Sequence, residues 1–159
     1  MTTQANKLVT FRLGDDLFAA NVHDVERVLR YAAPTAVPNM PSYIEGVMDY
    51  RGQVVPVINM RRRIELPDRE AQADTRMLVF NAGNELVAGV VDTVTEVTAF
   101  DPANVSPPPP LFRGLAAKYL RGTVRVGEKL LIYLDVQYLL SSTERIALQS
   151  AGAEVLSHV

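Results

Sequence analysis

The side chains that could do acid–base or metal chemistry are few in this sequence, and they follow no recognised pattern. The chain has two histidines, His23 and His158, and no cysteine, which excludes thiolate chemistry, disulfides and thiolate metal sites. No spacing of histidines or carboxylates matches a zinc site or a calcium loop, and no glycine-rich phosphate loop occurs. We therefore expect neither a metal nor a cofactor.

Paired carboxylates are the catalytic arrangement that the sequence leaves open. Asp92, Asp101 and Asp135 could meet in the folded chain and share acid–base work, although nothing in their spacing requires it. His23 lies at an alternating strand position beside an apolar neighbour, so a nucleophile–base pair has little material. The sequence thus favours a protein that is not an enzyme.

Composition and charge favour a globular protein that works through binding. The 159 residues are 48% hydrophobic and 21% charged, and the formal net charge of −2 does not favour nucleic acid or an anionic membrane as partner. The first residues do not resemble a signal peptide, and no apolar run approaches the roughly 20 residues of a membrane span. We expect a single cytoplasmic domain over residues 1–159, without direct membrane insertion. The basic run Arg61-Arg62-Arg63 is interpreted as a solvated helix face.

The chain repeats itself, which predicts two β-rich halves, about 8–64 and 77–140. Shifting residues 77–97 back by 69 positions superposes identical residues, and a fainter repeat at an offset of 76 relates 44–64 to 120–140. A half of this size buries too little surface alone, so the two halves should share a core. The identical pairs of the first repeat are Phe11 and Phe80, Gly14 and Gly83, Leu17 and Leu86, Ala19 and Ala88, Val22 and Val91, Val25 and Val94, and Val28 and Val97.

Short strands with glycine-rich turns favour small closed barrels, because closure removes unpaired edges. Asn59 and Asp135 occupy matching places after apolar strands, and each is expected to cap a short helical turn. Ser141 and Glu144 form a capping box, which predicts a C-terminal helix over about 141–155.

The segment 44–62, IEGVMDYRGQVVPVINMRR, resembles the signature of CheW-like domains, in which a Gly-Val pair, a hairpin tip with Arg-Gly, an apolar-Pro-Val strand and an Asp or Asn step recur in this order. LVTFRLGDDLFAANVHDVERVL, LVFNAGNELVAGVVDTVTEV and YLRGTVRVGEKLLIYLDVQYLL are similar to the family's other blocks, so the resemblance covers about residues 8–141. It implies an all-β fold with a short C-terminal helix: two pseudo-symmetric five-stranded SH3-like β-barrels packed around a shared hydrophobic core.

The same resemblance implies an adaptor function without catalysis. Members of the family couple chemoreceptors, the methyl-accepting chemotaxis proteins, to the regulatory domain of the histidine kinase CheA, and are recruited to membrane-associated receptor arrays. Arg51 and Gly52 match the hairpin-tip residues associated with receptor coupling. Val25 and Val28 match the apolar positions of an early strand that contact a partner. Because both valines recur in the second repeat, core packing is the other interpretation of these positions.

Two departures from the family pattern predict an unusual partner. Asp49 and Tyr50 stand where the family usually has Asn-Leu, which places a carboxylate two residues before Arg51. Arg27 stands where a Glu is common, so a standard receptor would meet the wrong charge. A divergent signalling system, such as one controlling surface motility or pili, is therefore expected. The candidate partner-binding residues are Val25, Arg27, Val28, Asp49, Tyr50, Arg51 and Gly52.

Two other functions remain open at this point. A CheW-like protein could occupy positions in an array as a structural or inhibitory component that carries no signal. A small β-barrel could also bind single-stranded nucleic acid, with Tyr50 as an exposed aromatic ring beside Arg51 and the run of arginines. The second possibility requires the Tyr50 ring to be accessible.

Overall fold

The computed structural model describes residues 6–107 and 119–139, which are mostly β-strand. The predicted C-terminal helix over 141–155 lies outside the described residues. No helix among the described residues is long and apolar enough to cross a bilayer. The helical elements are α1 (Met60–Arg63) and the 3-10 turns η2 (Val22–Asp24), η3 (Pro102–Asn104) and η5 (Val136–Tyr138). The strands are β1 (Lys7–Leu13), β2 (Asp16–Asn21), β3 (Val25–Arg30), β4 (Ile44–Tyr50), β5 (Gln53–Asn59), β6 (Arg76–Ala82), β7 (Glu85–Val91), β8 (Thr93–Ala99), β9 (Val105–Ser106), β10 (Leu120–Val126) and β11 (Lys129–Leu134).

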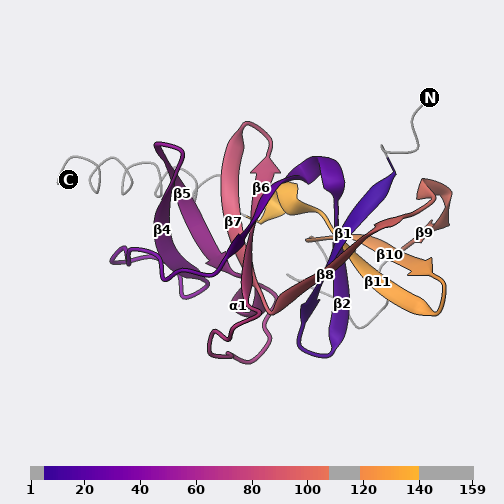
Figure 1. The fold of residues 1–159 in the computed structure, drawn as a ribbon, viewed down its shortest axis with the longest axis horizontal. Helices are drawn as coiled ribbons and strands as arrows, with labels where there is room; N and C mark the ends of the chain where they lie inside the picture. Colours follow the sequence, from indigo (N-terminus) through magenta and orange to yellow (C-terminus); the bar gives the residue numbers. More distant parts are fainter. Residues whose placement is uncertain (1–5, 108–118, 140–159) are drawn as a thin grey trace.

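These strands form two sheets that lie side by side in Figure 1. One sheet has the order β8-β1-β2-β11-β10-β9, and we call it the six-stranded barrel. The other has the order β3-β6-β7-β5-β4, and we call it the five-stranded barrel. The predicted all-β, two-barrel class is confirmed. The first sheet has six strands because the two-residue β9 pairs with the outer side of β10.

Each sheet draws strands from both sequence repeats. β3, from the first repeat, pairs with β6 of the second, whereas β8, from the second repeat, pairs with β1 of the first. The chain therefore passes between the sheets at two crossovers, one through η2 and the other at Asp92, between β7 and β8. The two repeats are similar in sequence, but neither forms a barrel from its own strands alone.

Matching positions of the two repeats have matching local geometry. The hairpins β4–β5 and β10–β11 each shift register at a glycine, Gly46 in one and Gly122 in the other. A Cβ added at either glycine would lie 2.1 Å from a backbone carbonyl oxygen, that of Thr35 or of Ser106. No side chain fits such a contact, so glycine is required at both positions.

The predicted caps are confirmed at both Asn59 and Asp135. The Asn59 side chain accepts a hydrogen bond from the Arg62 amide at the start of α1. Asp135 accepts one from the Gln137 amide at the start of η5. Both caps satisfy an amide that lacks a partner within its own helical turn.

Apolar side chains pack in three clusters, the largest of which joins the two barrels. It contains Phe11 and Phe18 from the six-stranded barrel and Leu78 and Phe80 from the five-stranded barrel, all nearly inaccessible to solvent. A second cluster fills the five-stranded barrel, and a third fills the six-stranded barrel. The shared hydrophobic core expected from the repeat is confirmed, because the largest cluster takes residues from both sheets.

Candidate partner-binding site

The β4–β5 hairpin carries Arg51 and Gly52 in a two-residue turn. Tyr50 and Gln53 pair directly across the hairpin, and φ is 53° at Arg51 and 80° at Gly52. Two positive φ values define a type I′ turn, which favours Asn-Gly, and an L-residue other than glycine pays about 1 kcal/mol for this conformation. Asp49 offsets part of this cost, because its carboxylate accepts a hydrogen bond from the Gly52 amide at 2.9 Å.

The Arg51 guanidinium pairs with Glu26 of β3. Its Nη1 lies 3.6 Å from Glu26 Oε2, its Cζ lies 5.2 Å from the centre of the Tyr50 ring, and its side chain is 63% exposed. Glu26 also accepts a hydrogen bond from the Tyr50 hydroxyl at 3.4 Å. The structure thus brings β3 and the β4–β5 tip together, as a shared partner-binding site requires.

Glu26 was not among the residues predicted for this site. The pairing of β3 with β6 shifts register between Val25 and Arg27, so Glu26 is the extra residue of a β-bulge. A bulge re-aims side chains out of the regular alternation of a strand. Two adjacent charged residues within the apolar pattern of "VERVL" are the signal that could have located this bulge.

The remaining predicted residues divide into exposed and supporting ones. Arg27 and Val28 are exposed on β3, Val28 to 42%. Val25 is half-buried and packs against the shared core, so core packing is the better interpretation there. Tyr50 is 7% exposed and belongs to the apolar cluster inside the five-stranded barrel. The expectation of an exposed aromatic ring at position 50 is therefore wrong, because the ring points inward and only its hydroxyl reaches Glu26.

The matching tip on the six-stranded barrel is built differently. The turn of the β10–β11 hairpin has Gly127, with φ of 60°, at the position that Arg51 occupies in β4–β5. Lys129 Nζ lies 2.8 Å from Glu96 Oε1 of β8, so this tip also reaches the edge strand of its own barrel. Val97, the counterpart of Val28, is likewise exposed. The repeat of this valine therefore does not reflect core packing.

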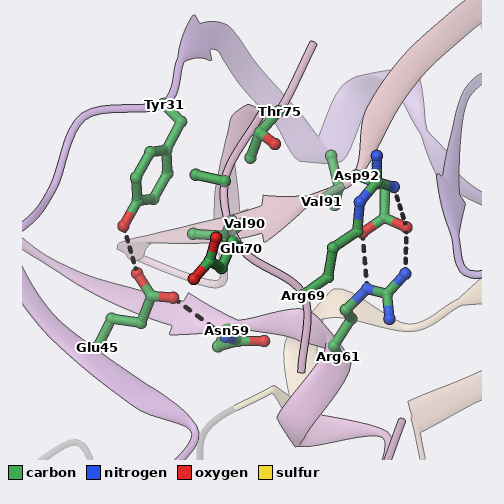
Figure 2. Close-up of a pocket in the computed structure, with 11 residues that line it drawn as sticks. Tyr31, Glu45, Asn59, Arg61, Arg69, Glu70, Thr75, Val90, Val91 and Asp92 are labelled. Carbon is green, nitrogen blue, oxygen red and sulfur yellow. Dashed lines mark hydrogen bonds and ion pairs between the residues drawn. The ribbon is translucent and has the colours of Figure 1, made fainter. Parts of the chain in front are cut away.

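The first arginine of the basic run is part of a buried ion pair. Asp92, at the crossover into β8, lies between Arg61 and Arg69, with closest N–O distances of 2.6 and 3.1 Å (Figure 2). The Gly14 amide donates a further hydrogen bond to Asp92 at 2.9 Å. Burial raises the pKa of Asp92, but the hydrogen bonds from Arg61 and Gly14 outweigh burial, so its pKa lies below the usual value.

The other two arginines are also engaged, so the prediction of a solvated helix face is wrong. Arg62 donates to Asp68 at 2.8 Å. Arg63 lies between the rings of Tyr43 and Tyr119, with Cζ 3.9 and 4.8 Å from the ring centres. These tyrosines are 76 residues apart, which is the offset of the second repeat. The arginines of α1 therefore contact residues of both repeats and help to hold them together.

The first crossover is held more loosely than the second. Asp24 of η2 lies 3.7 Å from Arg121 Nη2, and the same nitrogen lies 3.6 Å from Asp135. Burial raises the pKa of Asp24; Arg121 opposes this effect, and the charge of Asp135 adds to it. Asp101 instead caps η3. The three carboxylates considered for catalysis thus each serve a different local structure.

A small polar pocket lies beside the Asp92 ion pair (Figure 2). Glu45 lines it and accepts hydrogen bonds from the Tyr31 hydroxyl at 3.1 Å and from Asn59 Nδ2 at 3.0 Å. Across the described residues, no group of three or more metal-ligating side chains comes together. The interactions drawn in this pocket join its own side chains to one another, as in a structural network.

Comparison with known proteins shows which family this chain belongs to. A family model described as the CheW-like domain matches residues 7–144, which is most of the chain. The chain belongs to the CheW-like family. Chemotaxis protein CheW of Treponema pallidum is 30% identical over 142 residues, covering 87% of this chain and 84% of the relative. Chemotaxis protein CheW of Klebsiella aerogenes is 32% identical over 142 residues, covering 89% and 86%.

One further relative and one solved structure are also similar to this chain. Protein FrzA of Myxococcus xanthus is 34% identical over 115 residues, which covers 72% of this chain and 71% of FrzA. The crystal structure of the scaffolding protein TtCheW from Thermoanaerobacter tengcongensis matches with a TM-score of 0.79 and 26% identity, covering 88% of this chain and 90% of that chain. The role that the CheW-like family gives this chain is that of a chemotaxis coupling adaptor.

Proposed function

We propose that this protein is a non-catalytic adaptor that joins the cytoplasmic tip of a chemoreceptor to the regulatory domain of the histidine kinase CheA. Its place of action is then the cytoplasmic face of a membrane-associated receptor array, to which its partners recruit it. The family match over residues 7–144 supports the class of function. The observation that carries the site is Arg51, a well-exposed guanidinium kept in a strained turn between Asp49 and Glu26.

The proposed site has an outer and an inner layer. Arg27, Val28 and Arg51 are exposed and would contact the partner. Asp49 and Gly52 shape the turn, Tyr50 packs inside the five-stranded barrel, and Val25 packs against the shared core; these residues would position the outer three. This division explains why the sequence pattern spans both apolar and charged residues.

An adaptor transmits a signal only if a partner binds its alternative states differently. The β3 edge is hydrogen-bonded to β6, and β6 contributes to both the five-stranded barrel interior and the shared core. A receptor that shifts β3 would therefore act on packing shared by the two barrels. We propose this strand as the element through which receptor state reaches the kinase.

The receptor is proposed to belong to a divergent signalling system, such as one controlling surface motility or pili. The supporting observation is Arg27, which is exposed and so is available to a partner. A receptor suited to the Glu that is common at this position would face an unfavourable like charge. A standard receptor tip is thus expected to bind this protein more weakly than a cognate one does.

Two alternatives are less well supported. A small β-barrel that binds single-stranded nucleic acid stacks bases on exposed aromatic rings, and Tyr50 does not offer one. A structural or inhibitory array component would share the fold and the exposed Arg51. Only activity separates that alternative from a coupler: the coupler raises CheA autophosphorylation in the presence of receptor, and the inhibitor does not.

The test is to replace Arg51 by Glu and to measure receptor-dependent CheA autophosphorylation in a reconstituted array. We expect circular dichroism and thermal melting to stay nearly unchanged, while the affinity for the partner falls by about 2 kcal/mol, roughly thirtyfold. Lys129→Glu at the matching tip is the control, since it reverses the same charge on the other barrel. A large loss of stability in Arg51→Glu, or coupling as strong as that of wild type, would refute the role of Arg51.

A further inference from the structure

The edge strand β3 carries two arginines that its surroundings do not neutralise. Arg27 and Arg30 are exposed, and within residues 6–107 and 119–139 neither makes an ion pair or a side-chain hydrogen bond. Arg30 also lies directly opposite Arg76 in the pairing of β3 with β6. Like charges facing each other across a sheet are destabilising, so this edge carries positive charge at a cost.

Protection of an edge against aggregation is the simplest reason for exposed charge on an outer strand. The matching edge β8 tests that reason within the same molecule. Its carboxylate, Glu96, is paired with Lys129, and its Thr95 hydroxyl hydrogen-bonds to Thr10. The β8 edge is thus protected while its charge stays balanced. The surplus of positive charge on β3 is more than edge protection requires.

An exposed apolar side chain shares one face of β3 with one of these arginines. Val28 and Arg30 are two residues apart and lie on the same face, whereas Arg27 lies on the opposite face. Arg51 lies at the adjoining hairpin tip. Two carboxylates lie near the tip: Glu26 is shared by Arg51 and the Tyr50 hydroxyl, and Asp49 accepts a hydrogen bond from the Gly52 amide. Because the whole chain has a net charge of −2, attraction of an anion here would come from the local surface.

We propose that the open edge of β3 binds an acidic segment of a partner protein that lies along the strand. Its apolar side chain packs on Val28, and its carboxylates pair with Arg30 on the same face and with Arg27 on the other face. Guanidinium groups pair with carboxylates through two parallel hydrogen bonds, which gives this surface selectivity as well as affinity. The inference rests on the proposed function insofar as the segment would belong to the receptor. The inference adds to the proposed function that the receptor segment bound at β3 carries negative charge.

The test uses two synthetic helical peptides that share one leucine stripe and differ only in carrying glutamate or lysine beside it. Fluorescence anisotropy at low salt should show wild-type protein binding the glutamate peptide at least about tenfold more tightly, and added salt should reduce the difference. The double variant Arg27→Glu/Arg30→Glu should reverse the preference. Arg125→Glu/Lys129→Glu changes the net charge equally on the other barrel and should keep it. Circular dichroism confirms that each variant is folded.

Several results would overturn the inference. Equal binding of the two peptides, no binding of either, or an unchanged preference in the β3 double variant would each do so. Tighter binding of a single-stranded DNA than of the glutamate peptide would point instead to a phosphate backbone. A wild-type protein that activates CheA with receptor but shows no charge preference would refute this inference alone. One that prefers the acidic peptide but does not activate CheA would refute the coupling function alone.

Discussion

The two barrels close their hairpins against their edge strands in the same way but present different groups at the tip. Glu26 of β3 pairs with Arg51 in one barrel, and Glu96 of β8 pairs with Lys129 in the other. Closure of the barrel therefore accounts for an ion pair at either tip. It does not account for a non-glycine residue at positive φ, since Gly127 fills the matching position without strain. Strain that packing does not require is the better indicator of function.

The two crossovers between the sheets differ in how tightly they are held, and the tighter one leads into the barrel without the proposed partner surface. Asp92, which leads into β8, is held by Arg61, Arg69 and the Gly14 amide. Asp24, which leads into β3, shares Arg121 with Asp135, and the N–O distances to the two carboxylates are 3.7 and 3.6 Å. The barrel with the proposed partner surface is thus entered through the looser connection. A surface that must respond to a partner is drawn from the less stable parts of a fold.

The largest effect should come from a charge placed inside either barrel. Val55→Asp and Leu131→Asp each put a carboxylate into a closed apolar cluster, which costs about 4 kcal/mol or more. Because each barrel uses strands of both repeats, we expect one cooperative loss of structure in each variant. Urea denaturation followed by circular dichroism measures it. Two separate transitions would show that the barrels are independent.

Asp92→Asn should have the next largest effect, of about 3 kcal/mol at neutral pH, because it leaves Arg61 without its buried partner. The lowered pKa means that Asp92 contributes stability above its unfolded pKa and loses that contribution as pH falls through its folded pKa. The gap between wild type and variant should therefore narrow in acid. A gap independent of pH would contradict the assigned ion pair.

A change of turn residue should affect stability more at the β10–β11 tip than at the β4–β5 tip. Gly127→Ala should cost about 1 kcal/mol, because φ there is positive. Arg51→Gly relieves the same kind of strain and loses only a well-exposed ion pair, so stability should change by less than about 0.5 kcal/mol. Coupling to the kinase should nevertheless fall. Thermal melting of the two variants compares them directly.

The smallest effect on stability is expected for Asp24→Asn. The raised pKa of Asp24 means that its ionised form is unfavourable in the folded protein at neutral pH. Stability attributable to this group should rise as pH falls through its folded pKa, and the Asn variant should lack this dependence. Wild type and variant are compared by urea denaturation across the acid range. Marked destabilisation at neutral pH would show that Asp24 is a required ion-pair partner.

The repeat in the sequence predicted local geometry well. The caps at Asn59 and Asp135 follow from it, because equivalent residues in equivalent hairpins face similar surroundings. The recurrence of Val28 as Val97 suggested core packing, whereas both side chains are exposed. It could not predict which strands pair. Similarity between two halves is the same whether each half closes alone or exchanges its leading hairpin, β1–β2 or β6–β7, with the other.

Each feature of the site that the sequence did not predict has a physical reason. Glu26 was missed because a β-bulge breaks the alternation from which exposure is inferred. The partner of Arg61 was missed because Asp92 lies 31 residues away and no periodicity links the two. Tyr50 was a candidate for partner contact because it adjoins the hairpin tip, yet its ring belongs to the interior of the five-stranded barrel.

The exchange of the leading hairpins β1–β2 and β6–β7 has a consequence for any gene that encodes only one repeat. A chain cut between α1 and β6 would give a first fragment in which β3 has lost its neighbour in the sheet, and a second in which β8 has lost its own. Neither polypeptide would hold a complete barrel. Complementation of the two fragments on mixing would restore both barrels together.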